Sequence, residues 1–182
     1  MEDVFFGQRE LLIDSKLDRV EAVLKWFDSC WTDCCPIVNC DDPLLKAQAQ
    51  TAVVELFTNS VRHSHSDLDP APQIRLSWGA DSQFFRLSIS DHGRPFAPEE
   101  MFDCLRLVVL QGGARPDQRD QHWGLFMLLR LCDDYGWFIT SQRSATGVNT
   151  VLLEHAWLLV PDHTEKLWVP STTWMKPAPA CP

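Results

Sequence analysis

The fold is decided by residues 52–65, which read AVVELFTNSVRHSH. Within this apolar and small-residue run, Glu55, Asn59 and His63 recur every four residues. Each step of four residues along an α-helix drifts by only about 40° around its axis, so we expect one polar stripe three turns tall. The stripe would lie beside the apolar face. Taken alone, it fits a solvated helix edge as well as a binding site, because polar sets at this spacing are common.

The helix that carries the stripe has predicted start and stop signals. Asp41 or Asp42 can cap it, and Pro43 occupies the first helical position, where the missing N–H has no helical partner. Two prolines in residues 66–73, SDLDPAPQ, end it. Its predicted apolar face comprises Leu45, Ala49, Ala52, Val53, Leu56 and Val61.

The other segments alternate between strand and helix patterns. We expect one α+β domain over residues 1–160 and a Pro- and Trp-rich tail over 161–182, which would lie on the domain or on a partner. The predicted elements, in chain order, are a strand at 9–15, a helix at 17–31 that ends near Cys30, a connection at 34–40, a hairpin of strands at 73–79 and 83–90, a short helix at 98–110, a helix from Gly124, and strands at 136–144 and 149–155.

Composition excludes several classes of function. The chain has 182 residues, a net charge of −9 and a pI near 5.0, which argues against general nucleic-acid binding because phosphate neutralisation needs clustered Lys and Arg. No apolar run approaches the roughly 20 residues of a membrane span, and the N-terminal stretch lacks a signal-peptide pattern. We therefore expect a soluble cytoplasmic protein. Among seven cysteines, the cluster from Cys30 to Cys40 favours reduced thiols over disulfides or a zinc site.

A second group of polar and small residues begins where a strand is predicted to end, at Asp91. The segment 87–96 reads LSISDHGRPF. A carboxylate at a strand end can accept a hydrogen bond from an exocyclic amine, and Gly93 would let the backbone approach a flat ring closely. Adenine fits that description. The D-x-G pattern alone is weak, since aspartate is also a common turn residue.

A third element joins a glycine-bearing loop to a helix. Residues 111–129 read QGGARPDQRDQHWGLFMLL, with glycines at 112, 113 and 124. Free backbone N–H groups and the positive end of the helix dipole would form a phosphate site around Trp123, Gly124 and Leu125. A plain flexible loop remains the alternative for this element taken by itself.

In this order and at these separations, the three elements resemble the GHKL ATPase superfamily, which includes histidine kinase catalytic domains, gyrase B and MutL. The resemblance covers residues 8–155 and is closest to the RsbW-type anti-sigma-factor serine kinases, on the D-x-G-x-x-F form of the second motif, the G-L-F start of the third, and no upstream phosphoacceptor-histidine segment. The matching motifs are the N box ELFTNSVRH (55–63), the G1 box DHGRPF (91–96), the G2 box HWGLFMLL (122–129) and the strand GVNTV (147–151).

The resemblance implies a Bergerat fold, a two-layer sandwich with a mixed, mainly antiparallel sheet, helices on one face, and ATP between helices and lid. Asn59 would coordinate Mg²⁺ at the phosphates, and Glu55 would orient or deprotonate the attacking group. Asp91 would bind the adenine amine, with Thr150 supporting it through water. The remaining implied contacts are Gly93 and Phe96 at the pocket floor, Gly112, Gly113, Gly124 and Leu125 in the lid, and Arg62 or His63 as added charge.

Two functions of different classes follow from the resemblance. The first is a serine/threonine kinase that sequesters a sigma factor and is released when it phosphorylates a small antagonist protein. The second is a non-catalytic nucleotide-binding module that regulates a partner by occupancy alone. Intact Glu55 and Asn59 favour the kinase. Many relatives have a glycine two positions before Gly124, whereas this chain has His122 there, followed by the bulky Trp123, which favours the module. A homodimer is a further expectation.

Overall fold

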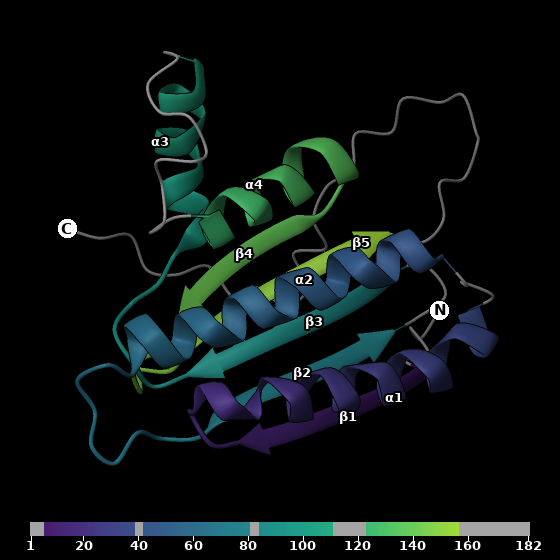
Figure 1. Cartoon of the computed structure of the whole chain (residues 1–182), viewed down its shortest axis with the longest axis horizontal. Helices are drawn as coiled ribbons and strands as arrows, with labels where there is room; N and C mark the ends of the chain where they lie inside the picture. Colours follow the sequence, from purple (N-terminus) through teal and green to yellow (C-terminus); the bar gives the residue numbers. More distant parts are fainter. Residues whose placement is uncertain (1–5, 39–41, 81–83, 111–122, 157–182) are drawn as a thin grey trace.

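A computed structural model describes residues 6–38, 42–80, 84–110 and 123–156 of the chain. The described chain forms two layers, a five-stranded antiparallel sheet and a set of helices, as expected for an α+β sandwich (Figure 1). The elements are β1 (Phe6–Ile13), a short helix η1 (Leu17–Arg19), α1 (Val20–Val38), α2 (Pro43–Asn59), a π-helical turn η2 (Ser60–Ser64), β2 (Ile74–Ala80), β3 (Phe84–Asp91), α3 (Pro98–Leu110), α4 (Trp123–Tyr135), β4 (Phe138–Arg143) and β5 (Asn149–Ala156).

The strand order in the sheet is β1-β2-β3-β5-β4, and every neighbouring pair is antiparallel. The sheet is therefore wholly antiparallel where we expected a mixed one. In the centre, β3 pairs with β5 so that Asp91 lies opposite Asn149. This register brings the end of β3 and the start of β5, which are far apart in the sequence, together at one end of the sheet.

Alternation along the strands places the hydrophobic core on one face of the sheet. In β3, Phe85, Leu87, Ile89 and Asp91 are buried, and the residues between them are partly exposed. The helices α1, α2 and α4 lie across the buried face, and α3 stands beside α4 (Figure 1). An aromatic cluster fills the space between the layers, namely Phe27, Trp31, Trp78, Phe85 and Trp137.

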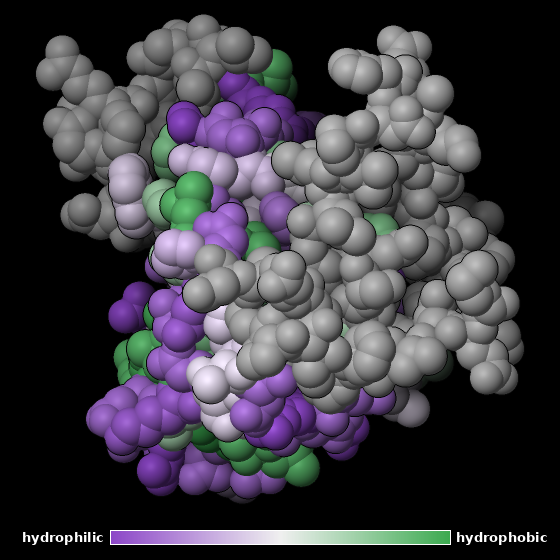
Figure 2. Space-filling view, turned by 90° about the vertical axis from the view of Figure 1, so that its right-hand side faces the viewer, coloured by the Kyte–Doolittle hydropathy of each residue, from purple (hydrophilic) through white to green (hydrophobic). Residues whose placement is uncertain are grey.

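The surface is mainly polar. Figure 2 shows a side on which hydrophilic residues predominate among the coloured atoms and apolar residues form small patches. Scattered apolar exposure of this kind is ordinary for a protein surface. No helix within the described ranges combines the length and apolar character that a membrane crossing requires. Within the described ranges, the exposed large apolar side chains are distributed over several elements and one loop: Leu12, Leu17, Leu44, Leu68, Met101, Leu107, Trp123 and Tyr135.

One boundary differs from the sequence prediction. Helix α1 continues to Val38 and does not end near Cys30, so most of the predicted connection at 34–40 is helical. The helix passes through Pro36, which lies in its last turn. A proline there removes one backbone hydrogen bond, and it does so close to the C-terminus of the helix, where the last carbonyl groups have no helical partner.

The start of α2 is fixed by a side-chain cap. The Asp42 carboxylate accepts hydrogen bonds from the backbone N–H groups of Leu44 (2.8 Å) and Leu45 (3.2 Å), and Pro43 follows at the first helical position. Of the two predicted caps, the structure selects Asp42. The cap matters for the site because α2 carries both Glu55 and Asn59.

Replacing Asp42 with alanine is expected to lower the free energy of unfolding by about 1 kcal/mol, because two N–H groups of the first turn lose their acceptor. Urea denaturation followed by circular dichroism measures the change. Asp42→Asn is the matched control, since asparagine also caps helices and should cost only a few tenths of that value. Equal losses for both variants would show that the cap is not what stabilises this end of α2.

Candidate functional site

The centre of the site is the Asp91 carboxylate, which lies at the end of β3 and is 5% exposed. It accepts three hydrogen bonds, from Ser60 Oγ (2.8 Å), the backbone N–H of Gly93 (2.9 Å) and Asn149 Nδ2 (2.8 Å). A carboxylate offers about four acceptor positions. Within this network, three are used, so the carboxylate is held in one orientation and retains capacity for one more donor.

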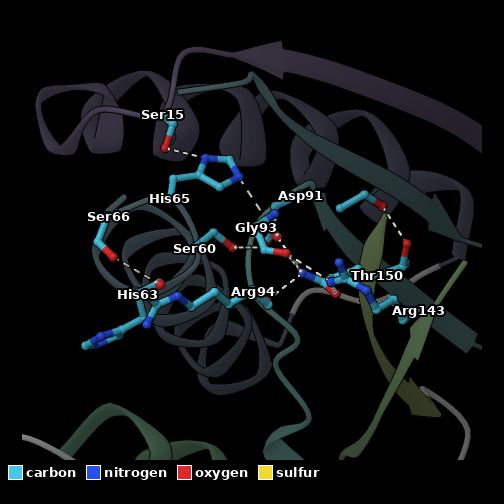
Figure 3. A network of polar contacts seen from close by, with 12 residues as sticks. Ser15, Ser60, His63, His65, Ser66, Asp91, Gly93, Arg94, Arg143 and Thr150 are labelled. Atoms are coloured by element: carbon cyan, nitrogen blue, oxygen red, sulfur yellow. Dashed lines mark hydrogen bonds and ion pairs between the residues drawn. The ribbon is translucent and has the colours of Figure 1, made fainter. Parts of the chain in front are cut away.

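The helix that faces Asp91 changes its winding at this point. Residues 60–64 form a π-helical turn, closed by a hydrogen bond from the His65 N–H to the Ser60 carbonyl oxygen (3.0 Å). The i to i+5 spacing of a π turn places Ser60 and His65 on the same side of the helix, toward Asp91 (Figure 3). His63, which the regular stripe placed in line with Glu55 and Asn59, is exposed instead. The α-helical spacing from which the stripe was predicted therefore ends at Asn59, and His63 lies in the π turn.

Gly93 allows the chain after β3 to lie directly against this π turn. A β-carbon at Gly93 would overlap the backbone carbonyl of Ser64, and the N–H of Arg94 donates to that same carbonyl oxygen (3.2 Å). The glycine is required by close approach between two backbones, whereas the sequence predicted close approach to a flat ring. Phe96, three residues on, is partly buried and packs against the core.

Asn149 supports Asp91 from β5. Its side-chain amide donates to Asp91 Oδ1 and to the carbonyl oxygens of Gly93 (3.2 Å) and Arg94 (2.7 Å). In turn, the Arg143 guanidinium donates to Asn149 Oδ1 and to the Gly93 carbonyl oxygen (3.0 Å). The amide therefore ties the carboxylate to the turn that follows it (Figure 3).

Thr150 lies on the other face of the sheet, because neighbouring residues of a strand point to opposite faces. Its hydroxyl pairs with that of Ser90 at 2.9 Å. The structure therefore gives Asn149, and not Thr150, the place beside Asp91. A groove of about 300 Å³ occupies that other face, lined in part by Arg86, Thr150 and Glu154, and so is separate from Asp91.

The second part of the site lies where α2 meets the start of α4. A β-carbon at Gly124 would overlap the Glu55 carboxylate, so this side chain rests against the first turn of α4. Burial raises the pKa of Glu55 above its ordinary value, and the Arg62 guanidinium opposes the shift. Asn59 follows one turn later on α2 and is partly exposed. The structure thus brings together Glu55 of the first motif and Gly124 of the third.

The other predicted lid residues have different outcomes. Leu125 is buried, at 6% exposure, and belongs to the core. Trp123 is the first residue of α4, is 49% exposed, and packs on Phe126 with ring centroids 5.7 Å apart. Gly112 and Gly113 lie outside the described residues, as does the tail from residue 157.

These residues fit an adenine nucleotide with a magnesium ion. Asp91 has capacity to accept a hydrogen bond from an amine. The part of the chain that the structure describes contains no group of three or more His, Cys, Asp or Glu side chains able to hold a metal. Magnesium commonly binds through one or two protein oxygens together with phosphates and water, so a single amide oxygen such as that of Asn59 suits it.

Sequence reasoning missed Ser60, His65, Arg143 and Asn149. Ser60 and His65 looked like ordinary polar residues at the end of a helix, and only the π turn directs them to Asp91. Asn149 had a signal that could have been used. It immediately precedes Thr150, and because neighbouring side chains of a strand point to opposite faces, only one of the two can face the helices.

Helices packed on one face of an antiparallel sheet, with a buried aspartate where the central strand ends, place the chain in the class of GHKL-type ATP-binding domains. The model of the histidine kinase-like ATPase domain family matches residues 13–153, and the chain belongs to this family. No curated protein matches it. Membership of an ATPase domain family implies ATP binding, commonly together with Mg²⁺, and indicates a regulatory protein.

Proposed function

We propose that this ATP-binding protein is a cytoplasmic serine/threonine kinase of the anti-sigma-factor type, which binds a sigma factor and phosphorylates a small antagonist protein. The observation that carries the proposal is the Asp91 carboxylate, fixed by three donors with one acceptor position left. An exocyclic amine of adenine is the donor that this position suits. A homodimer is part of the same proposal.

The adenine end of the site is built from β3, β5 and the π turn. Asp91 would accept from the amine, while Ser60 and Asn149 keep the carboxylate from rotating. Gly93 lets the chain after β3 pack against the π turn and so keeps Ser60 beside Asp91, and Phe96 would add apolar surface below the ring. Because all these groups are in place before the ligand binds, little ordering is needed on binding.

The phosphate end is built from α2 and the start of α4. Asn59 would hold magnesium, which supplies charge neutralisation for the phosphates. Glu55 would orient the attacking hydroxyl of the antagonist protein and take its proton. The N–H groups at Gly124 and Leu125 would add donors for phosphate oxygens, with Gly112 and Gly113 completing the lid and Arg62 or His63 adding positive charge.

Replacing Glu55 with glutamine is expected to reduce phosphoryl transfer by about 100-fold or more, because amide cannot accept the proton, while ATP binding changes little. Transfer of radiolabel from ATP to candidate antagonist proteins measures it.

Since the base must be ionised and burial raises the pKa of Glu55, wild-type activity should fall on acidification at a higher pH than for an exposed glutamate. Asn59→Ala is the comparison variant and should lose both transfer and metal-dependent binding.

A non-catalytic module that acts by sequestration is the second candidate, and the placement of Trp123 favours it. The indole begins α4 and is half exposed at the point where phosphates would approach. The same label-transfer experiment separates the two functions. A wild-type protein that binds ATP but transfers no label to any antagonist, and behaves like its Glu55→Gln variant, would be the module.

A further inference from the structure

His65 is the buried group that the proposed function leaves without a role. Its side chain is 1% exposed, and its Nδ1 atom pairs with Ser15 Oγ at 2.8 Å. Among the residues that the structure describes, its Nε2 atom has no hydrogen-bond partner, and it lies 4.0 Å from Asp91 Oδ1 (Figure 3). A buried polar atom without a partner is costly, so its presence beside the Asp91 carboxylate calls for a reason.

The π turn is what places this ring. In a regular α-helix, residues five apart point in directions about 140° from each other. Here the i to i+5 hydrogen bond between Ser60 and His65 brings both side chains to the Asp91 side. π turns of this kind recur at functional sites. One irregular turn thus supplies two of the groups that surround the carboxylate.

The chemistry of the surroundings selects one tautomer of the ring. If the Ser15 hydroxyl donates to Nδ1, the ring proton is on Nε2 and faces the carboxylate. The opposite tautomer would turn an imidazole lone pair toward the negative charge of Asp91. The Oδ1 atom of Asp91 already accepts hydrogen bonds from Gly93 and Asn149. At 4.0 Å, the Nε2–H group of His65 acts on this oxygen as an oriented dipole.

We propose that His65 is a positioning residue for Asp91. Ser15 holds the ring of His65 through Nδ1, and the Nε2–H group of the same ring keeps the Asp91 carboxylate turned toward the purine amine. The inference rests on the proposed function, because it assumes that Asp91 binds nucleotide. It also links the segment after β1 to the nucleotide site, since Ser15 lies between β1 and η1.

Charged and titratable neighbours decide how this contact responds to pH. Burial lowers the pKa of His65, the Asp91 carboxylate opposes that shift, and His92 adds to it. From β4, Arg143 reaches the same network through Asn149. The ring is therefore neutral at pH 7. Protonation on acidification places a cation beside Asp91 that competes with the purine amine, so nucleotide binding weakens.

Two substitutions of His65 distinguish the contribution of Nε2 from that of Nδ1. Glutamine places its amide nitrogen near the position of Nε2, whereas asparagine reaches only as far as Nδ1. With Mg-ATP as the probe in titration calorimetry, His65→Asn should bind about tenfold more weakly than wild type and His65→Gln within about threefold. Because the pKa of His65 is lowered from the ordinary value of 6.5, wild-type affinity should fall on acidification below that pH, and more steeply than that of His65→Gln, which has no imidazole to protonate.

His155 supplies a matched control. It is the other histidine with an unpartnered buried nitrogen within the described ranges, and its Nε2 lies 3.1 Å from the Tyr135 carbonyl oxygen, away from Asp91. His155→Gln should bind Mg-ATP like wild type at every pH. If both His65 variants bind like wild type, or both weaken equally in step with lost stability, the positioning role is overturned. Absence of binding by the wild-type protein itself would overturn the proposed function together with this inference.

Discussion

Replacing Asp91 with asparagine is expected to weaken ATP binding by about 10- to 100-fold, the cost of losing a charge-assisted hydrogen bond and its orientation. The amide would present an N–H group to Ser60, Gly93 or Asn149, all of which donate to the carboxylate in the native protein. At least one donor would then face another donor. Titration calorimetry with Mg-ATP measures the change in dissociation constant.

The control for this variant is Ser60→Ala, which removes one donor and leaves the carboxylate in place. It should weaken binding by only a few fold, because Gly93 and Asn149 still hold the carboxylate. Thermal unfolding of both variants verifies that they are folded under the conditions of the titration. Wild-type affinity in folded Asp91→Asn would mean that Asp91 does not contact the nucleotide.

Gly93→Ala is expected to lower the free energy of unfolding by about 3 kcal/mol, at the upper end of what an overpacking substitution costs. The new methyl group would overlap the backbone carbonyl of Ser64, and two backbone segments would have to separate. Their separation would also pull the π turn away from Asp91. ATP binding should therefore be lost even where the variant remains folded, and urea denaturation together with calorimetry reports both effects.

Gly124→Ala is the contrasting variant. Its methyl group would overlap the end of the Glu55 side chain, which can rotate away, so the stability should change by less than about 1 kcal/mol. Displacement of Glu55 should instead reduce phosphoryl transfer. If Gly124→Ala proved as destabilising as Gly93→Ala, backbone contact would not be what distinguishes the two glycines.

Elements with regular periodicity could be predicted from the sequence. Helix α3 has the predicted bounds of 98–110, and α2 begins at Asp42 and Pro43 as its cap signals indicated. Strand β3 alternates buried and partly exposed residues as expected, and β2 alternates as far as Trp78, after which Gly79 and Ala80 are also buried. The resemblance implied that the N box and the G2 box share one site, and Glu55 of the N box lies against Gly124 of the G2 box.

Features that depend on register or on irregular winding could not be predicted. The choice between Asn149 and Thr150 depends on which face each residue takes in β5, and a shift of one residue reverses it. The π turn at residues 60–64 has no periodic signal, yet it exposes His63 and buries His65. The roles of Gly112 and Gly113 in the lid stay predictions, since these residues lie outside the described ranges.

The central claim is that a magnesium-linked adenine nucleotide binds between α2, the end of β3 and the start of α4. Isothermal titration of Mg-ATP into the purified protein, repeated with a chelator and with Asp91→Asn, tests it most directly. The account predicts binding in the micromolar range, on the order of −8 kcal/mol, that is weakened by the chelator and by the substitution. Absence of heat with the folded wild-type protein, or binding that neither change affects, would contradict it.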